Sequence, residues 1–212
     1  MNLIELSQIK VIHKRYDYHH KIQSFWGSMS KSGINGEFTY MTAEQKKLSK
    51  FLSTLEHNST TSLVMKPRQA GITYLLCMYG LMKAFKEGKT ILFISPTLAM
   101  SRCLDTIVNN ITYYGCGVMP NTQNKHAVEF MNGGRFLRAT ANSAESTLCG
   151  LSVDTLICDE IGCQRNISMK IEDICKCAIP QLYGNGGNLI MTDSYESHGL
   201  YGNLPHKICV DL

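Results

Sequence analysis

The residues best suited to chemistry form the octapeptide KPRQAGIT, residues 66–73, between an apolar run and a helical pattern. Loops that hold nucleotide phosphates follow the pattern G-x-x-x-x-G-K-[ST]; their amides face the phosphates and the hydroxyl binds magnesium. Gly71 and Thr73 match this pattern in position. Lys66 stands where the first glycine is usual, and Ile72 where the lysine is usual. Two interpretations stay open: a deviant phosphate loop, or an ordinary strand–loop–helix turn with a surface lysine.

A deviant loop still needs a cation beside the β- and γ-phosphates, but that cation need not come from one fixed position. Lys66 begins the loop, and its long, flexible side chain can reach toward the phosphates. Arg68 is a second candidate cation in the same loop. Lys66 and Arg68 are therefore the candidates to supply the charge that Ile72 lacks.

The apolar run LICDE, residues 156–160, ends in two consecutive acids. Acids at the end of a buried strand are costly without a cationic partner. They are explained if Asp159 holds magnesium through water and Glu160 polarises the water that attacks the γ-phosphate. A solvent-exposed pair at a strand end is the alternative. Because the acids follow a phosphate-loop-like turn, the order of the two motifs favours ATP hydrolysis.

Two further positions are weaker candidates. Gln45 lies three residues after Thr42, a spacing that fits a capping box at a helix start. A glutamine amide can equally bond both the amino group and a ring nitrogen of adenine, so both interpretations stand. Thr192 begins a Thr-Asp-Ser segment after the last apolar run. Its polar groups suit a position beside the γ-phosphate, or a plain turn after a strand.

Short apolar runs at 61–65, 91–94, 155–158 and 188–191 alternate with helical patterns. This alternation predicts an α/β fold with a mainly parallel central sheet and helices on both faces. Residues 132–134, Asn-Gly-Gly, predict a hairpin between two further short strands. Ligands bind at the carboxyl ends of strands in such sheets, which is where the polar candidate residues fall.

The chain divides into three parts on this pattern. Residues 1–40 are expected to form an arm or lid and a linker, and they include a Gly/Ser-rich stretch. Residues 41–205 carry the regular alternation and form the predicted ATPase domain. Residues 206–212 are expected to be a tail, or the start of a linker to a further domain.

The composition of the chain excludes few classes of protein, but it limits the expected environment and partners. No apolar run reaches the length of a membrane span, and the N-terminus does not fit a secretory signal. The net charge of +4 is compatible with a polyanion partner without requiring one. Nine cysteines without such a signal are expected to be reduced thiols. The spacing of Cys158, Cys163, Cys175 and Cys177 disfavours a structural zinc site.

From about Phe38 to Tyr201, the motif order resembles the ATPase domain of terminase large subunits from tailed bacteriophages. The resemblance includes the glutamine before the first strand, the Arg-Gln pair in the deviant loop and Ser-Pro-Thr at 95–97. It also includes Asn-Gly-Gly before a strand with two arginines, a serine-rich turn, the Asp-Glu pair and the last strand. Some members carry the loop's lysine at its start, the position of Lys66.

The resemblance implies a P-loop NTPase of the additional-strand (ASCE, RecA-like) type. It implies magnesium-dependent ATP hydrolysis that drives double-stranded DNA into a procapsid. The implied partners are a ring of five copies on a portal and a small terminase subunit, in the host cytoplasm. With the residue chemistry above, the expected catalytic residues are Glu160, Lys66, Arg68 and Arg138. The expected nucleotide-binding residues are Gln45, Lys66, Pro67, Arg68, Gln69, Ala70, Gly71, Ile72, Thr73 and Thr192. The expected metal-binding residues are Thr73 and Asp159.

Some features depart from the family. Many relatives have Arg-Gly where this chain has Cys149-Gly150, so Arg135 and Arg138 are the candidates for an arginine acting across subunits. Asp193 is unusual in the last strand's motif. The nuclease domain of larger relatives does not fit in this chain, so no DNA cleavage is expected. A helicase-like ATPase and a degenerate nucleotide-binding regulatory module remain as alternatives.

Overall fold

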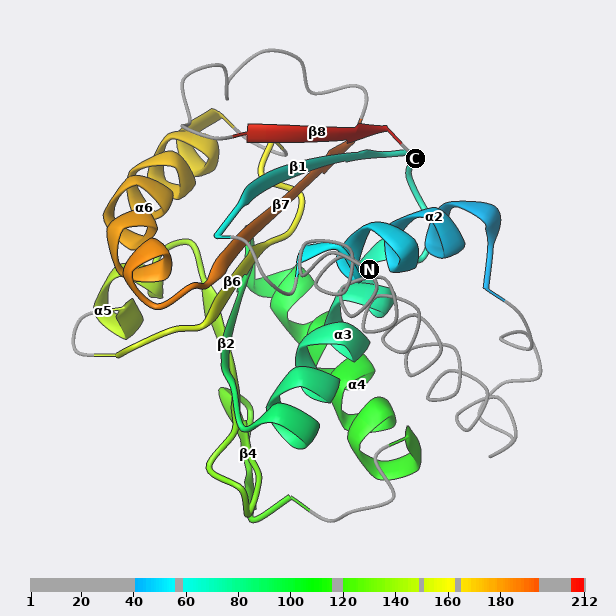
Figure 1. Cartoon of the computed structure of the whole chain (residues 1–212), viewed down its shortest axis with the longest axis vertical. Coiled ribbons are helices and arrows are strands. Elements are labelled where there is room, and N and C mark those ends of the chain that lie inside the picture. Colours follow the sequence, from blue (N-terminus) through cyan, green and yellow to red (C-terminus); the bar gives the residue numbers. More distant parts are fainter. Residues whose placement is uncertain are drawn as a thin grey trace, which may run out of the picture.

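The computed structural model describes most of the chain from residue 41 onward (Figure 1). The described residues are 41–55, 59–115, 120–148, 151–162, 165–194 and 207–211. The expected N-terminal arm and the Cys149-Gly150 turn lie outside them. None of the helices in these ranges is long and apolar enough to cross a membrane.

An eight-stranded sheet forms the centre, in the order β3-β4-β5-β2-β6-β7-β1-β8. The strands are β1 (Thr61–Lys66), β2 (Thr90–Ser95), β3 (Thr122–Gln123), β4 (Ala127–Glu129), β5 (Arg135–Thr140), β6 (Thr155–Cys158), β7 (Asn188–Ser194) and β8 (Lys207–Asp211). From β5 to β8 every neighbouring pair is parallel, whereas β3, β4 and β5 are joined antiparallel. The predicted mainly parallel sheet and the predicted hairpin are both confirmed.

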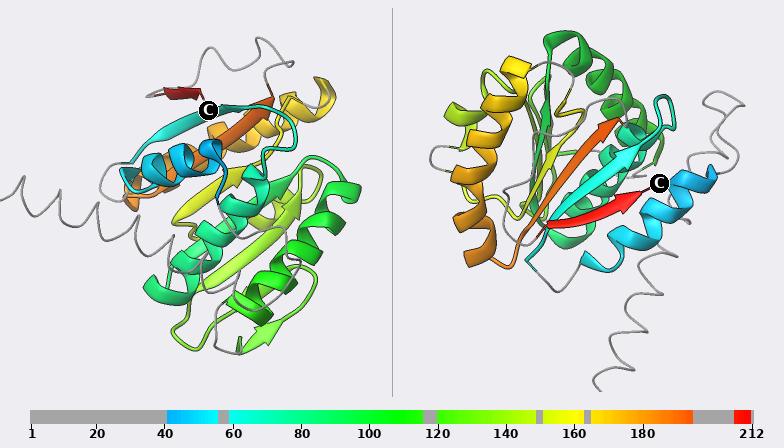
Figure 2. Two further views of the ribbon diagram at one scale, coloured as in Figure 1. Left: turned by 90° about the vertical axis from the view of Figure 1, so that its right-hand side faces the viewer. Right: turned by 90° about the horizontal axis from the view of Figure 1, so that it is seen from above.

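Helices cover both faces of the sheet, as the alternation of strands and helices predicts (Figures 1 and 2). The helices are α2 (Ala43–Leu52), α3 (Ile72–Glu87), α4 (Leu98–Gly115), α5 (Ala144–Leu148) and α6 (Arg165–Gly184). α2, α3 and α4 pack together on one face, and α5 and α6 cover the other. The two faces are called the α3 face and the α6 face below.

Strand side chains alternate between two apolar cores, one on each face. In β2, Ile91 and Phe93 belong to the core on the α3 face, and Leu92 and Ile94 to the core on the α6 face. In β6, Ile157 is on the α3 face, between neighbours that face α6. Because successive residues of a strand point to opposite sides, this alternation also fixes where the residues after each apolar run point.

α3 links the candidate phosphate loop to the hairpin. It begins after Gly71 and ends at Gly88, and both glycines have left-handed backbone conformations, with φ of 69° and 67°. The side-chain amide of Asn132 donates to the carbonyls of Ala84 (3.2 Å) and Phe85 (2.7 Å). These carbonyls lie in the last turn of α3, where carbonyl groups lack amide donors from within the helix. The hairpin therefore also caps the helix that follows the loop.

Three features differ from the expectations. β7 continues through Ser194 instead of ending at Met191, because Val64 and Lys66 of β1 pair with Thr192 and Ser194. The expected tail forms β8, which pairs in parallel with β1 at the edge of the sheet. The short strand β3 had no recognisable pattern in the sequence and lies at the opposite edge.

Candidate nucleotide-binding site

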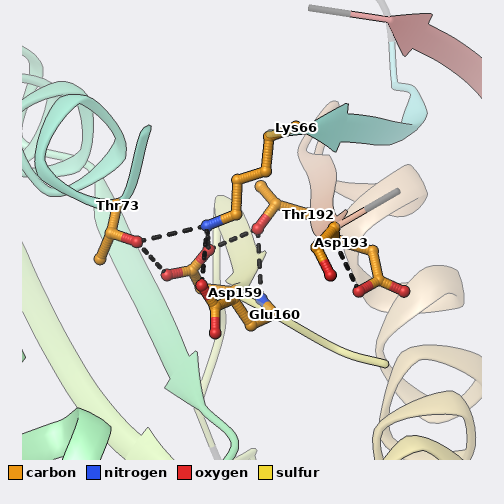
Figure 3. A network of polar contacts seen from close by, with 7 residues as sticks. Lys66, Thr73, Asp159, Glu160, Thr192 and Asp193 are labelled. Carbon is orange, nitrogen blue, oxygen red and sulfur yellow. Dashed lines mark hydrogen bonds and ion pairs between the residues drawn. The ribbon is translucent and has the colours of Figure 1, made fainter. Parts of the chain in front are cut away.

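The candidate residues meet at the carboxyl edge of three neighbouring strands, β6, β7 and β1. Lys66 is the last residue of β1, Asp159 directly follows β6, and Thr192 lies in β7. Val64, Ile157 and Ile190 lie in the α3-face core. Because strand side chains alternate between faces, the residues two positions further along, Lys66, Asp159 and Thr192, also point to the α3 face. Thr73, in the first turn of α3, faces them (Figure 3). These four residues are called the polar cluster below.

Lys66 points into the polar cluster and not into solvent, since its side chain is only 5% exposed. Its Nζ atom lies 2.9 Å from Asp159 Oδ1 and 3.4 Å from Glu160 Oε1, and it donates to Thr73 Oγ1 at 3.4 Å (Figure 3). A buried ammonium is tolerated only with such partners. The interpretation of Lys66 as a surface lysine is therefore wrong.

Asp159 is buried, and the other three members of the polar cluster all bond to its carboxylate. Its Oδ2 atom accepts from Thr73 Oγ1 at 2.5 Å, and its Oδ1 atom accepts from the Thr192 hydroxyl as well as from Lys66. The buried carboxyl group of Asp159 is thus paired with a cation and with two hydroxyl donors. The alternative of a solvent-exposed strand-end acid does not hold for Asp159.

Glu160 differs from Asp159 in exposure and in backbone conformation. Its side chain is 37% exposed, and its φ of 50° is left-handed, which costs a non-glycine residue roughly 1 kcal/mol. Two bonds hold this turn: the Glu160 amide donates to Thr192 Oγ1 at 3.2 Å, and the Ile161 amide to the Thr192 carbonyl at 3.0 Å. The turn gives the second acid access to water while the first stays buried. Unfavourable backbone conformations persist where surrounding contacts enforce them, often at functional sites.

Thr192 and Asp193 are neighbours with opposite surroundings. The Thr192 hydroxyl is fully buried and bridges Asp159 and the Glu160 amide. Asp193 points away from the polar cluster (Figure 3). Its Oδ1 atom accepts from the Ser194 amide at 2.8 Å, but its buried Oδ2 atom has no hydrogen-bond partner within the described part of the chain. Only Thr192 of this pair belongs to the site.

The rest of the candidate loop is more exposed. Arg68 and Gln69 are exposed, and Pro67 and Ala70 are half-buried. Gln69 has a φ of 60°, so the loop makes a second left-handed turn before the one at Gly71.

Ile72 is buried in the α3-face core. The position where a lysine is usual therefore serves packing here.

Gln45 forms the predicted capping box. Its backbone amide donates to Thr42 Oγ1 at 3.2 Å, and its Oε1 atom accepts from the Thr42 amide at 2.9 Å. Its Nε2 atom also donates to the Gly71 carbonyl at 3.1 Å, which the sequence did not predict. No local pattern could have indicated this contact, because its partners are 26 residues apart.

The structure does not bring Arg138 to the polar cluster. Arg138 is on the α3 face of β5, which is two strand spacings from β6, roughly 10 Å, and four from β1, roughly 19 Å. Its guanidinium is buried, pairs with Asp105 of α4 at 2.8 Å and also donates to the Asn124 carbonyl. Burial lowers the pKa of Arg138, and the Asp105 carboxylate opposes that shift. Arg135, at the start of β5, is exposed and lies 3.4 Å from Glu129.

The oxygen atoms of the polar cluster fit magnesium. One carboxylate and one hydroxyl, completed by phosphate oxygens and water, are a usual set of ligands for this ion. Thr73 Oγ1 and Asp159 Oδ2 are already adjacent, at 2.5 Å. Among the described residues, no three His, Cys, Asp or Glu side chains gather to hold a metal by themselves. Thr73 and Asp159 are therefore the residues of the polar cluster that could hold magnesium.

Two of the cysteines considered for zinc lie in the α6-face core. The sulfur atoms of Cys158 and Cys175 are 3.9 Å apart, and Cys177 is exposed on the other side of α6. The hydrogen bond with Cys175, together with burial, raises the pKa of the Cys158 thiol well above its usual value. Cys158 is thus held as a neutral thiol directly before the acidic pair.

No protein-family model and no curated protein matches the sequence. Solved structures do match. The HK97 bacteriophage large terminase has a TM-score of 0.63 at 14% identity, over 90% of this chain and 43% of that protein. The N-terminal domain of the DNA packaging ATPase from bacteriophage phi29 has a TM-score of 0.55 at 10% identity, over 77% of this chain and 93% of that domain. The helicase MrfA, bound to DNA and AMPPNP, has a TM-score of 0.56 at 17% identity, over 89% of this chain and 29% of that protein.

At sequence identities this low, the comparisons establish the fold alone. The chain has a P-loop ATPase fold, with a mainly parallel sheet between two layers of helices. The expected structural resemblance to the ATPase domains of phage large terminases is confirmed. The chain spans less than half the length of the HK97 protein.

Proposed function

We propose that this chain binds and hydrolyses ATP with magnesium, as the motor domain of a terminase large subunit that moves double-stranded DNA into a procapsid. The observation that carries the proposal is the position of Lys66. Its ammonium lies 2.9 Å from Asp159 Oδ1 and within reach of Thr73, at the mouth of the candidate phosphate loop. This position supports the proposal that a cation from the start of the loop takes the place of the usual lysine.

The polar cluster suggests a division of labour. Lys66 and the backbone of residues 67–71 would bind the β- and γ-phosphates. Thr73 and Asp159 would hold magnesium, which when bound neutralises charge on the phosphate oxygens. Incoming phosphates would offer Lys66 new anionic partners and so release Asp159 toward the ion. Thr73 and Asp159, the two proposed magnesium ligands, lie side by side in this structure.

The second acid is the candidate for proton chemistry. Glu160 is close to Lys66 yet reaches solvent, so its carboxylate can polarise a water molecule directed at the γ-phosphate. Thr192 contacts Asp159 and the Glu160 amide, and it would transmit a change at the acids to β7. Arg68, in the exposed part of the loop, would stabilise or sense the γ-phosphate.

The DNA-packaging part of the proposal rests on the structural relatives and the charge. Two similar structures are described as a large terminase and a DNA packaging ATPase. The net charge of +4 is compatible with a DNA partner. We propose a ring of five copies docked on a portal, with a small terminase subunit as partner, in the host cytoplasm.

A helicase-like ATPase is the second candidate, favoured by the similarity to the helicase MrfA. Thr97, the last residue of the Ser-Pro-Thr segment, caps a helix in this structure. Thr97 Oγ1 accepts from the Met100 amide at 3.3 Å at the start of α4. Stimulation of ATP turnover by double-stranded or by single-stranded DNA distinguishes the two candidates.

The test begins with calorimetric titration of magnesium-ATP into wild type, Lys66→Ala and the matched control Lys176→Ala. Lys176 is an exposed lysine of α6 whose Nζ atom lies 4.0 Å from Asp173 Oδ1, and it does not belong to the polar cluster. We expect Lys66→Ala to weaken binding at least about tenfold, the equivalent of one charge-assisted contact, and Lys176→Ala to leave it unchanged. Equal affinity of wild type and Lys66→Ala would remove the basis of the proposal.

Turnover is then measured with double-stranded DNA, single-stranded DNA and no DNA, with assembly followed by light scattering. We expect double-stranded DNA to stimulate turnover most in the assembled state. Preferential stimulation by single-stranded DNA would favour the helicase candidate. Binding without turnover in an assembled ring would favour a degenerate regulatory module.

A further inference from the structure

Both ends of the Gln45 side-chain amide are already used within the protein. Oε1 accepts from the Thr42 amide at 2.9 Å, and Nε2 donates to the Gly71 carbonyl at 3.1 Å. The residue is only 2% exposed. The amide therefore connects the first turn of α2 to the last residue of the candidate phosphate loop.

The contact with Gly71 is tight and lies where the loop becomes a helix. A Cβ atom at this position would come within 2.5 Å of Gln45 Nε2, and the φ of 69° also favours glycine. The Gly71 carbonyl accepts the first bond of α3, from Leu75 N at 3.3 Å, in addition to the bond from Gln45. Gln45 thus helps to fix the orientation of the peptide that starts α3, two residues before Thr73.

A glutamine that reads adenine must present its oxygen and its nitrogen to the base at the same time. In this structure such an interaction would break both bonds of Gln45. It would take from the Thr42 amide and from the Gly71 carbonyl the partners that the buried Gln45 side chain gives them, and both of these bonds are partly buried. Breaking them has a cost, because a polar group that is partly shielded from water loses a hydrogen bond.

We propose that Gln45 is a positioning residue for the phosphate loop and does not select the base. Resting on the proposed nucleotide site, this assignment makes Gln45 a determinant of triphosphate affinity. Its contribution is the same for adenine and guanine nucleotides and for a triphosphate without a base.

The variant Gln45→Glu separates the two roles of the amide. A glutamate at this position of a capping box still accepts from the Thr42 amide. It cannot donate to the Gly71 carbonyl and instead places a second oxygen against it. Thr42→Ala is the matched control: it removes the hydroxyl that accepts from Gln45 N but keeps both side-chain contacts of Gln45.

Affinities for magnesium-ATP, magnesium-GTP and magnesium-tripolyphosphate are measured by calorimetry for wild type and both variants. We expect Gln45→Glu to weaken all three by a similar factor, about tenfold, and to leave the ATP-to-GTP ratio unchanged. Thr42→Ala should change each affinity much less. A selective loss of ATP affinity in Gln45→Glu would overturn the inference.

A measurement on wild type guards against a variant that fails to fold. The side-chain amide resonances of Gln45 should shift alike when ATP, GTP or tripolyphosphate binds. A shift seen with ATP alone would assign Gln45 to the base. If wild type binds none of the three ligands, both the proposed function and this inference are contradicted. Binding with an adenine-specific effect at Gln45 would end only the inference.

Discussion

Lys66 and Arg138 are two buried cations on the same face of one sheet, and both were candidates for catalysis. Their side chains are 5% and 1% exposed, so burial does not distinguish them. Their partners do. Lys66 meets Asp159 and Glu160, which follow β6, and Thr73, in the first turn of α3, all at the carboxyl edge of the sheet. Arg138 bonds to α4 and to the segment before β4 and so fastens structural elements to β5.

The chemistry of the two side chains explains the difference. A lysine ammonium is a compact charge on a flexible stem and can exchange one oxygen partner for another. The guanidinium of Arg138 is a rigid fork whose NH1 and NH2 groups are engaged, while its buried Nε finds no hydrogen-bond partner in the ranges that the structure describes. A movable cation among acids suits a site that must accept phosphates. A fixed cation between elements suits stability.

The largest expected effect is on turnover, at the acid next to Lys66. Glu160→Gln should reduce ATP hydrolysis by roughly 10²- to 10⁴-fold, because an amide cannot accept the proton of the attacking water. Binding of magnesium-ATP should persist, since Lys66, Thr73 and Asp159 remain. Steady-state phosphate release and calorimetry measure the two quantities.

Glu87→Gln is the matched control for that experiment. Glu87 is comparably exposed, at 33%, and pairs with Lys83 within α3. Its replacement should leave turnover unchanged. Undiminished turnover in Glu160→Gln would remove Glu160 from its proposed role and would weaken the distinction between the two buried cations.

The next effect is on stability. Arg138→Met should lower the free energy of unfolding by about 3 kcal/mol, because Asp105 loses its partner and the Asn124 carbonyl loses a donor. Urea denaturation measures the loss. The double variant Arg138→Met, Asp105→Leu should recover part of it, since replacing both charges of a buried pair is often near neutral.

Nucleotide affinity completes the test of Arg138. Below its unfolding transition, Arg138→Met should bind magnesium-ATP like wild type. A variant that folds normally yet loses turnover in the assembled ring would return Arg138 to catalysis, as the resemblance to terminases had implied.

A smaller effect is expected at Asp193, a buried acid that no cation accompanies among the described residues. Its Oδ2 atom has no hydrogen-bond partner, in contrast to the fully engaged carboxylate of Asp159. Asp193→Asn keeps the acceptor for the Ser194 amide and removes the unpaired charge. The free energy of unfolding should rise by about 1 kcal/mol, as thermal or urea denaturation can measure. A marked fall would contradict the interpretation that the buried Oδ2 atom of Asp193 destabilises the fold.

The proximity of Lys66, Asp159 and Thr192 could be expected from local sequence patterns, while their roles stay predictions. Lys66 and Asp159 each end an apolar run, and the carboxyl ends of parallel strands share one edge of the sheet. The side on which they point follows from counting by two along each strand. The adjacency of β6, β7 and β1 could not be predicted in this way, because strand order depends on how distant segments pack.

Two contacts that change the interpretation of candidate residues could not be predicted from local sequence patterns. Arg138 meets Asp105 across 33 residues, and Gln45 meets Gly71 across 26. The polar character of Thr192 and Asp193 favoured a turn, but pairing with β1 keeps them in the strand. In each case tertiary packing overrides a short-range signal.

The smallest effect is expected at Arg135, which lies on the same strand as Arg138 and differs from it in burial. Its side chain is 47% exposed, and it meets Glu129 at 3.4 Å on the surface of the β4–β5 pair. Solvent screens such pairs, so Arg135→Met should change the free energy of unfolding by less than about 0.5 kcal/mol. Parallel urea titrations of Arg135→Met, Glu129→Gln and Arg138→Met make the comparison direct. Equal losses from the two arginine variants would show that burial of the guanidinium is not what makes Arg138 structural.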